Sequence, residues 1–220
     1  MYADHHFQIF LHIVLFALWL GSSVTILVMV CWLHRHSNAL GERKMALSCL
    51  SYLVRVPKTV FILMLPMGLQ LASNLGLIKL ASGSTIGVWV FAIIWLAIDW
   101  IGAPNWQTST AQAMRIVERI LQAAFVVVLG GAGVLSLLSG APVDASWLAT
   151  KMVIYASILV VMALFDFSLE KAYPQLEGNS EPIAGDKPFL SPVVIAAVLL
   201  IVTIVLLLVA AWTGFNSWRV

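Results

Sequence analysis

Six long apolar stretches separated by polar connections set the pattern of this chain. They lie at about 8–33, 58–78, 86–103, 119–139, 147–167 and 190–213. Each is close to the roughly 20 residues that a helix needs to cross a bilayer. An apolar segment in lipid must satisfy its backbone hydrogen bonds internally, so each stretch should be a helix. The sequence therefore predicts an all-α fold, a polytopic membrane helical bundle that forms one integral membrane domain over residues 1–220.

Composition supports this class of protein. The chain is 61% hydrophobic and only 10% charged, whereas a soluble domain carries about 25% charged residues. The first stretch is too long, and too weakly charged before its apolar part, for a cleaved signal peptide. We therefore expect it to remain in the mature chain, with the lipid bilayer as its partner. The net charge is +2, and no basic patch indicates nucleic-acid binding.

Basic residues in the connections predict the orientation. Lys and Arg accumulate in cytoplasmic loops, and the two sets of alternating connections differ strongly in these residues. Three of them, Lys79, Lys151 and Arg219, fall on one side. The other nine fall on the opposite side: Arg35, Arg43, Lys44, Arg55, Lys58, Arg115, Arg119, Lys171 and Lys187. Both termini should then lie outside, and the protein should be a multi-pass protein of the inner (cytoplasmic) membrane.

The long connection between spans one and two has a pattern of its own. Apolar residues recur at helical spacing through residues 39–54: Met45, Leu47, Leu50, Tyr52 and Leu53. Such a pattern is typical of an amphipathic helix at a membrane surface. We expect a helix there on the inner surface.

Polar residues within the spans fall into two layers once the direction of each span is assigned. The outer layer collects His12, Lys151, Gln70, Asn74, Trp89 and Trp147. The inner layer collects Arg55, Lys58, Asp99, Asp166 and Glu170. Opposite charges at one depth most simply pair, since burying either charge alone is costly. The inner layer is therefore interpreted as a structural set of ion pairs, with a proton or ion path as the alternative.

His12 is the only histidine inside a span. It could be a histidine bonded between helices, or it could ligate heme b or another metal. No other span carries a histidine, so a second axial ligand would have to come from Lys151, Met152 or an open position. At the N-terminus, His5 and His6 follow Asp4 and could hold copper, although an exposed terminus is more often merely solvated.

Three patches resemble a known group of membrane proteins. The segment LHIVLFALWLGSS, with His12 second, resembles the first helix of the copper-resistance D family and of the bacterial membrane protoporphyrinogen oxidases. WLATKMVIYASILVVMALF resembles their helix with a conserved lysine, at the position of Lys151. Arg55-Val56-Pro57 followed by LMLPMGLQLA resembles a segment of their uncharacterised integral membrane relatives, which are the nearest fit. The resemblance implies that His12 is a heme ligand and that Lys151 belongs to the same site.

Two functions of different class follow from these patterns. The first is a heme- or metal-binding redox protein whose site lies near the outer face, around His12 and Lys151. We expect Trp89 or Trp147 to form a wall of this site and Gln70 or Asn74 to supply a hydrogen bond to the cofactor. The second is a cofactor-free copper or solute permease, or an accessory subunit that partners a membrane complex or forms a homo-oligomer. Neither pattern specifies an enzymatic reaction.

Overall fold

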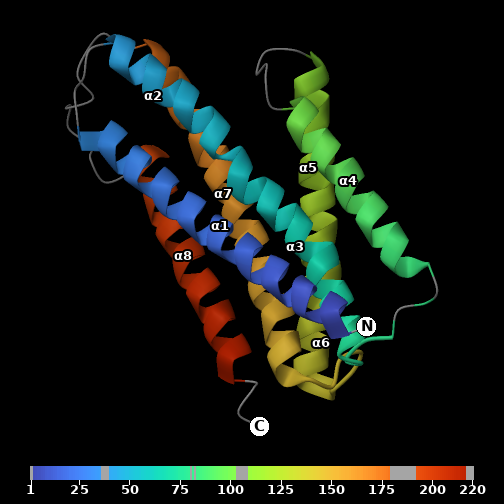
Figure 1. The fold of residues 1–220 in the computed structure, drawn as a ribbon. Helices are drawn as coiled ribbons and strands as arrows, with labels where there is room; N and C mark the ends of the chain where they lie inside the picture. Colours follow the sequence, from blue (N-terminus) through green and yellow to red (C-terminus); the bar gives the residue numbers. More distant parts are fainter. Residues whose placement is uncertain are drawn as a thin grey trace.

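The structure is a computed structural model that describes residues 2–35, 40–79, 81, 83–102, 109–178 and 192–216. Over these residues the regular secondary structure is entirely helical (Figure 1). The helices are α1 Tyr2–Arg35, α2 Leu40–Leu53, α3 Arg55–Asn74, α4 Ser84–Gly102, α5 Ser109–Phe125, the π-helical turn η1 Val126–Gly130, α6 Gly131–Ser139, α7 Ser146–Gly178 and α8 Pro192–Asn216.

The six predicted spans are present. Within the described residues, six helical segments are long and apolar enough to cross a membrane: His5–Leu33, Ser48–Asn74, Ser84–Ile101, Ser109–Ser139, Ser146–Lys171 and Pro192–Phe215. Large apolar side chains lie exposed along these segments, as lipid-facing positions should. The chain is a multi-pass membrane protein.

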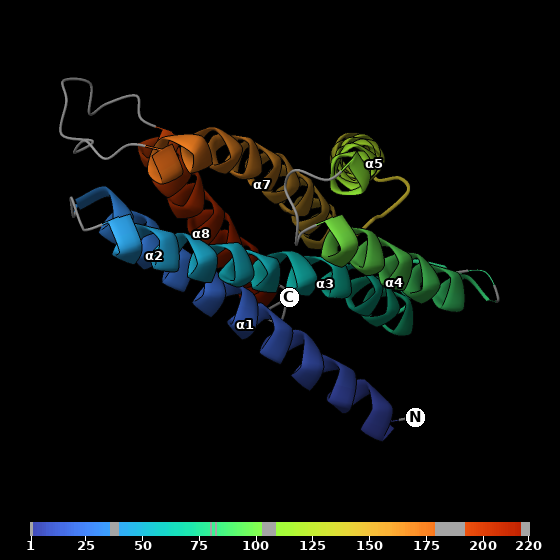
Figure 2. The same cartoon turned by 90° about the horizontal axis from the view of Figure 1, so that it is seen from above.

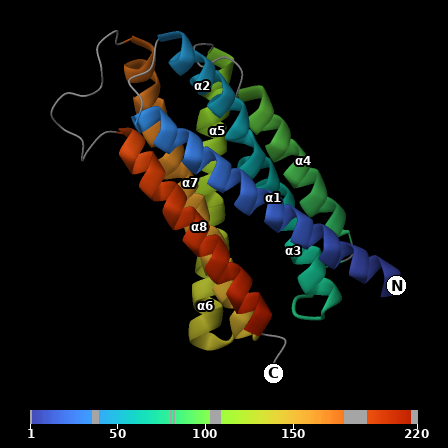
Figure 3. The same ribbon diagram turned by 60° about the vertical axis from the view of Figure 1, so that its left-hand side comes forward.

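The second span begins earlier than its apolar pattern indicates. α2 and α3 are separated by Val54 alone, which itself has helical backbone angles. Figures 1 and 3 show the two helices as one nearly continuous rod. Ala46 and Leu50 of α2 are buried against side chains of α1, α7 and α8. The amphipathic helix predicted on the inner membrane surface is therefore not confirmed.

The fourth span also begins earlier, at Ser109, and contains a π-helical turn in its middle. Two glycines, Gly130 in this turn and Gly133 after it, lie against α7. A β-carbon on Gly130 would lie 3.1 Å from Ala156 Cβ, and one on Gly133 would lie 2.9 Å from Val153 Cγ2. Small residues let two membrane helices approach this closely, so the glycines position α6 on α7.

The helices pack as a bundle in which α1 lies between α3 and α8, while α7 contacts α8, η1 and α6. α4 joins the bundle through α3 and α5 (Figure 2). The start of α1 and the end of α8 lie at the same end of the bundle, opposite α2 and the start of α5 (Figures 1 and 3). An even number of spans requires this arrangement, but which end faces the cytoplasm remains a prediction.

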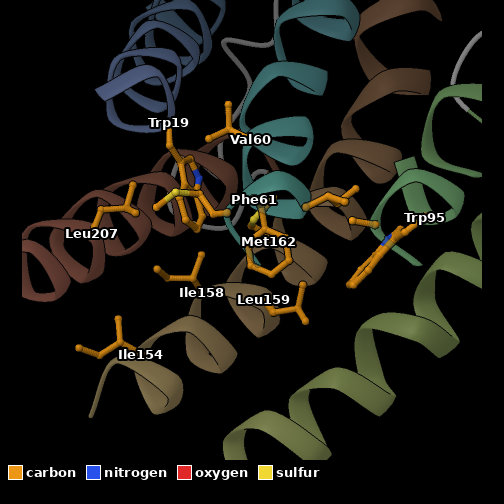
Figure 4. Close-up of a cluster of buried hydrophobic side chains, with 12 residues drawn as sticks. Trp19, Val60, Phe61, Trp95, Ile154, Ile158, Leu159, Met162 and Leu207 are labelled. Atoms are coloured by element: carbon orange, nitrogen blue, oxygen red, sulfur yellow. The ribbon is translucent and has the colours of Figure 1, made fainter. Parts of the chain in front are cut away.

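The centre of the bundle is an aromatic and aliphatic cluster (Figure 4). Phe61 of α3 stacks on Tyr155 of α7 with ring centroids 4.2 Å apart, and Trp19 of α1 meets Phe61 edge-on at 5.5 Å. The Tyr155 hydroxyl donates a hydrogen bond to the Phe61 carbonyl oxygen over 2.5 Å. This packing fixes α3 against α7. It thereby sets the positions of the charged side chains that these helices carry near the α2 end of the bundle.

Candidate functional site

Four helices bring charged side chains together near one end of the bundle. Lys58 lies in the first turn of α3, and Asp99 lies in the last turn of α4. Glu118 projects from α5 and Asp166 from α7. We refer to these four residues as the Lys58 cluster.

A single ammonium group joins the cluster. Lys58 Nζ lies 2.6 Å from Asp166 Oδ2, 3.4 Å from Glu118 Oε1 and 3.7 Å from Asp99 Oδ1. The four side chains are largely buried, and that of Asp99 is only 4% exposed. Three carboxylates thus face one ammonium inside a membrane-spanning bundle, where an unbalanced charge is costly.

Arg55 does not complete the balance by a direct ion pair. Its guanidinium lies over the rings of Tyr52 and Trp100, with Cζ 5.0 and 5.6 Å from the ring centroids. Its charge still acts on Asp99 across the site. Of the two bases expected in the inner layer, Arg55 and Lys58, it is Lys58 that lies at ion-pair distance from Asp99.

Asp99 and Glu118 both face the ammonium of Lys58. Glu118 Oε1 accepts a further hydrogen bond from Gln122 Nε2, over 3.1 Å. Asp99 Oδ2 is buried and faces no donor among the described residues. Ionised carboxylates are acceptors only, so neither Asp99 nor Glu118 can donate a hydrogen bond unless one of them is protonated.

A cavity of about 110 Å³ opens beside the cluster. On its more exposed side, Arg119 Nη2 binds both carboxylate oxygens of Glu170 at 2.6 and 2.7 Å, and Arg115 Nη1 lies 3.8 Å from the same carboxylate. Besides the cluster, the lining consists of Ser51, Val54, Arg55, Arg115, Arg119, Gln122, Ala163, Leu169 and Glu170. Its charged residues comprise four bases and four acids. The cavity can therefore hold water among ionisable groups.

The outer layer has a different geometry. The His12 ring lies against Gly68 of α3, where an added β-carbon would be 4.0 Å from His12 Cε1. His12 Nδ1 is buried without a partner among the described residues. Lys151 of α7 is close enough for its charge to act on His12, and its Nζ lies 5.3 Å from the centroid of the Trp147 ring. His12, Lys151 and Trp147 thus occupy one neighbourhood.

The remaining outer-layer residues form contacts between helices. Trp89 Nε1 of α4 donates to Gln70 Oε1 of α3 over 3.1 Å. Asn74 Nδ2, also on α3, donates to Gln8 Oε1 of α1 over 2.6 Å. Gln70 and Asn74 are thus engaged in holding α3 to its neighbours.

The proposed metal ligands do not assemble into a cage. Across the described residues, no three His, Cys, Asp or Glu side chains are placed to hold a metal ion. The rings of His5 and His6 are 6.3 Å apart between centroids. The side chain of Asp4 lies outside the described residues. Copper at this terminus therefore stays a prediction.

Sequence reasoning missed Glu118 and Gln122. Both residues are buried on α5, one turn apart on the same face. The apolar pattern placed the start of this span at residue 119, which left Glu118 in the preceding connection. The helical spacing of two polar residues beside an apolar run was the signal available.

Comparison with protein-family models, with characterised proteins and with solved structures finds no match for this chain.

Proposed function

We propose that the protein is a cofactor-free permease of the cytoplasmic membrane that carries protons through the Lys58 cluster. The observation that carries this proposal is the contact of one buried ammonium with three carboxylates from three different helices, beside a cavity. Ionisable residues inside membrane spans are rare and commonly mark ion or proton pathways.

The number of carboxylates favours transport over a purely structural role. A structural ion pair needs one acid for Lys58, and each additional buried carboxylate adds a desolvation cost that the ammonium cannot offset. Groups in this position relieve the excess charge by taking up a proton. Because α4, α5 and α7 each contribute one acid, a change in protonation also alters the contacts of α3 with its neighbours.

The test is proton flux in liposomes. The purified protein is reconstituted with a pH-sensitive dye inside, and a pH gradient is applied with the membrane potential clamped by potassium and valinomycin. We expect faster dissipation than in protein-free liposomes, and a loss of that excess in Lys58→Met and Asp166→Asn. Lys79→Met is the matched control, since Lys79 is exposed in a connection. Wild-type flux equal to that of protein-free liposomes would contradict the proposal.

A second candidate is a heme- or metal-binding redox site around His12 and Lys151, favoured by the buried Nδ1 of His12, which has no partner in the described part of the chain. A neutral imidazole with one free ring nitrogen is a ligand for heme iron or copper. The residues fit such a group in two respects. His12 would offer a ring nitrogen to the metal, and the Lys151 ammonium would pair with a heme propionate. Bound heme would supply one-electron redox chemistry.

Absorbance tests this second candidate without any activity assay. If the site binds heme b, protein purified from cells supplied with heme shows a Soret band that His12→Ala abolishes and Lys151→Ala weakens. The double variant His5→Ala/His6→Ala should keep the band, since six to seven residues of α1, roughly 9–10.5 Å along the helix, separate those residues from His12. A wild-type spectrum without a Soret band, together with no copper retained on desalting, would contradict this candidate.

A further inference from the structure

We infer that Asp99 and Glu118 share a single proton, which makes this pair of carboxyl groups the proton-holding element of the Lys58 cluster. The inference deepens the proposed proton permease and rests on it for its functional meaning. The shared proton itself follows from local geometry and can be tested separately.

Asp99 lacks a hydrogen-bond donor for one of its oxygens. Asp99 and Glu118 face the same ammonium, and ionised carboxylates are acceptors only, so neither can donate to the other. Glu118 Oε1 already receives Lys58 Nζ and Gln122 Nε2, at 3.4 and 3.1 Å. Asp99 Oδ2 is buried without any donor among the described residues. A proton held between the two carboxyl groups supplies the donor that Asp99 Oδ2 lacks.

Lys58 is paired mainly with Asp166. Its ammonium is closest to Asp166, at 2.6 Å, and is about 1 Å farther from the oxygens of Glu118 and Asp99. Asp166 therefore has the ammonium as its main counter-ion. Two adjacent carboxylates that share one site seldom both ionise, because their like charges repel. The pair can bind a proton while Asp166 remains ionised.

The other charged groups that line the same cavity come from three helices. α3 contributes Arg55 and Lys58, α5 contributes Arg115 and Arg119, and α7 contributes Asp166 and Glu170. Glu170 is held by Arg119 in a two-oxygen contact. Arg55 and Lys58 act on Asp99 and offset the one charge that remains on the protonated pair.

The pocket beside the pair gives the shared proton a way out, and its release would change the contacts of Lys58. The pocket of about 110 Å³ has room for water beside the pair, so the proton leaves a carboxyl oxygen for a water in the pocket. The pair then carries two charges and attracts Lys58 more strongly. We expect the ammonium to move from Asp166 on α7 towards α4 and α5, which would couple proton release to the contact between α3 and α7.

Infrared difference spectroscopy of the reconstituted protein tests the shared proton. A protonated carboxylic acid has a carbonyl stretch that carboxylates lack and that shifts in heavy water. We expect this band in the wild-type protein at neutral pH, and its loss in both Asp99→Asn and Glu118→Gln. Each amide can donate to the remaining carboxylate in place of the proton, so both variants should fold, which their thermal unfolding transitions would verify.

Glu170→Gln is the matched control, because Glu170 lines the same pocket but is paired with Arg119. This variant should keep the band. A band that survives in both Asp99→Asn and Glu118→Gln, or its absence from the wild-type protein, would overturn the shared proton.

Combining this spectrum with the flux assay separates the two proposals. Flux without the band rejects the shared proton and leaves the permease in place. A band without flux supports the shared proton and contradicts the permease.

Discussion

Lys58 is the residue on which the charged end of the bundle depends. Its ammonium is the cation at ion-pair distance from three acids in the described part of the chain. Removing Lys58 and removing one of its three acids should therefore change the free energy of unfolding by different amounts. Without Lys58, three carboxylates face one another; without Asp99, Lys58 still has two partners.

Lys58→Met should accordingly destabilise the protein strongly. Breaking a buried charge pair by removing one partner costs about 3–5 kcal/mol, and we expect a loss of that size in the free energy of unfolding. The measurement is reversible unfolding in mixed micelles with increasing fractions of a denaturing detergent. Lys79→Met, at an exposed position, should leave the transition unchanged.

Asp99→Asn should change the same free energy by less than about 1.5 kcal/mol, the size of one hydrogen bond. Depth in the span alone suggested that Asp99 was one member of a simple ion pair, whose loss would leave an unpaired lysine. If Asp99→Asn were as damaging as Lys58→Met, Asp99 would be the main counter-ion of Lys58 and the shared proton would be wrong.

At the scale of the elements, the fourth span depends on how closely α6 approaches α7. The π-helical turn Val126–Gly130 precedes α6 and adds a residue to one turn of the span. Gly133 then lies against Val153, Met152 and the Ala149 carbonyl. At Gly131 there is open space where a side chain would be, because nothing lies within 4 Å of an added β-carbon. The two glycines, two residues apart, thus have different roles.

Gly133→Ala should therefore destabilise the protein by about 1–3 kcal/mol, the usual cost of overfilling a tight contact. Its β-carbon would lie 2.9 to 3.1 Å from three atoms of α7. Gly131→Ala should be neutral, or more stable by up to about 1 kcal/mol, because alanine favours a helix. Unfolding in mixed micelles compares the two variants directly. Equal effects would mean that the glycines do not set the distance between α6 and α7.

At the scale of the whole molecule, the structure shows which helix ends lie at each end of the bundle. Which of the two ends faces the cytoplasm is predicted only from the basic residues in the connections. The start of α1 and the end of α8 lie at the same end of the bundle (Figure 3). The Lys58 cluster lies towards the opposite end, where the nine-to-three asymmetry of basic residues predicts the cytoplasm. A proton would then pass between the cluster and the cytoplasmic side.

Reporter fusions test this orientation. Fusions of a cytoplasmic and a periplasmic reporter after Lys44, Gln107 and Glu177 should all indicate the cytoplasm, and fusions after Lys79 and Asp144 should indicate the opposite side. Those two connections serve as internal controls within the same membrane. A periplasmic signal after Lys44 would reverse the bundle and would place the Lys58 cluster near the outer face.

The sequence by itself determined the class of protein and the depth of most polar residues. A helix rises by a constant amount per residue, so position in a span translates into depth, and Lys58, Asp99 and Asp166 were expected at one level. Each apolar stretch is predicted to be a helix because unsatisfied backbone groups are costly in lipid. Counting these stretches gives the number of spans. Glu118 was missed because the start of an amphipathic span is poorly marked by apolarity.

Only the tertiary structure decided which side chains face each other. Depth leaves the rotation of each helix about its axis open, and helices that are apolar on every side carry little periodicity to define it. Packing around Phe61 and Tyr155 and the close approach at Gly133 set those rotations. These rotations direct Lys58 towards three acids and place Arg55 over aromatic rings. They also bring Lys151 close enough for its charge to act on His12. The partners of a charge are thus a property of the packed bundle, because they depend on contacts between residues far apart in the chain.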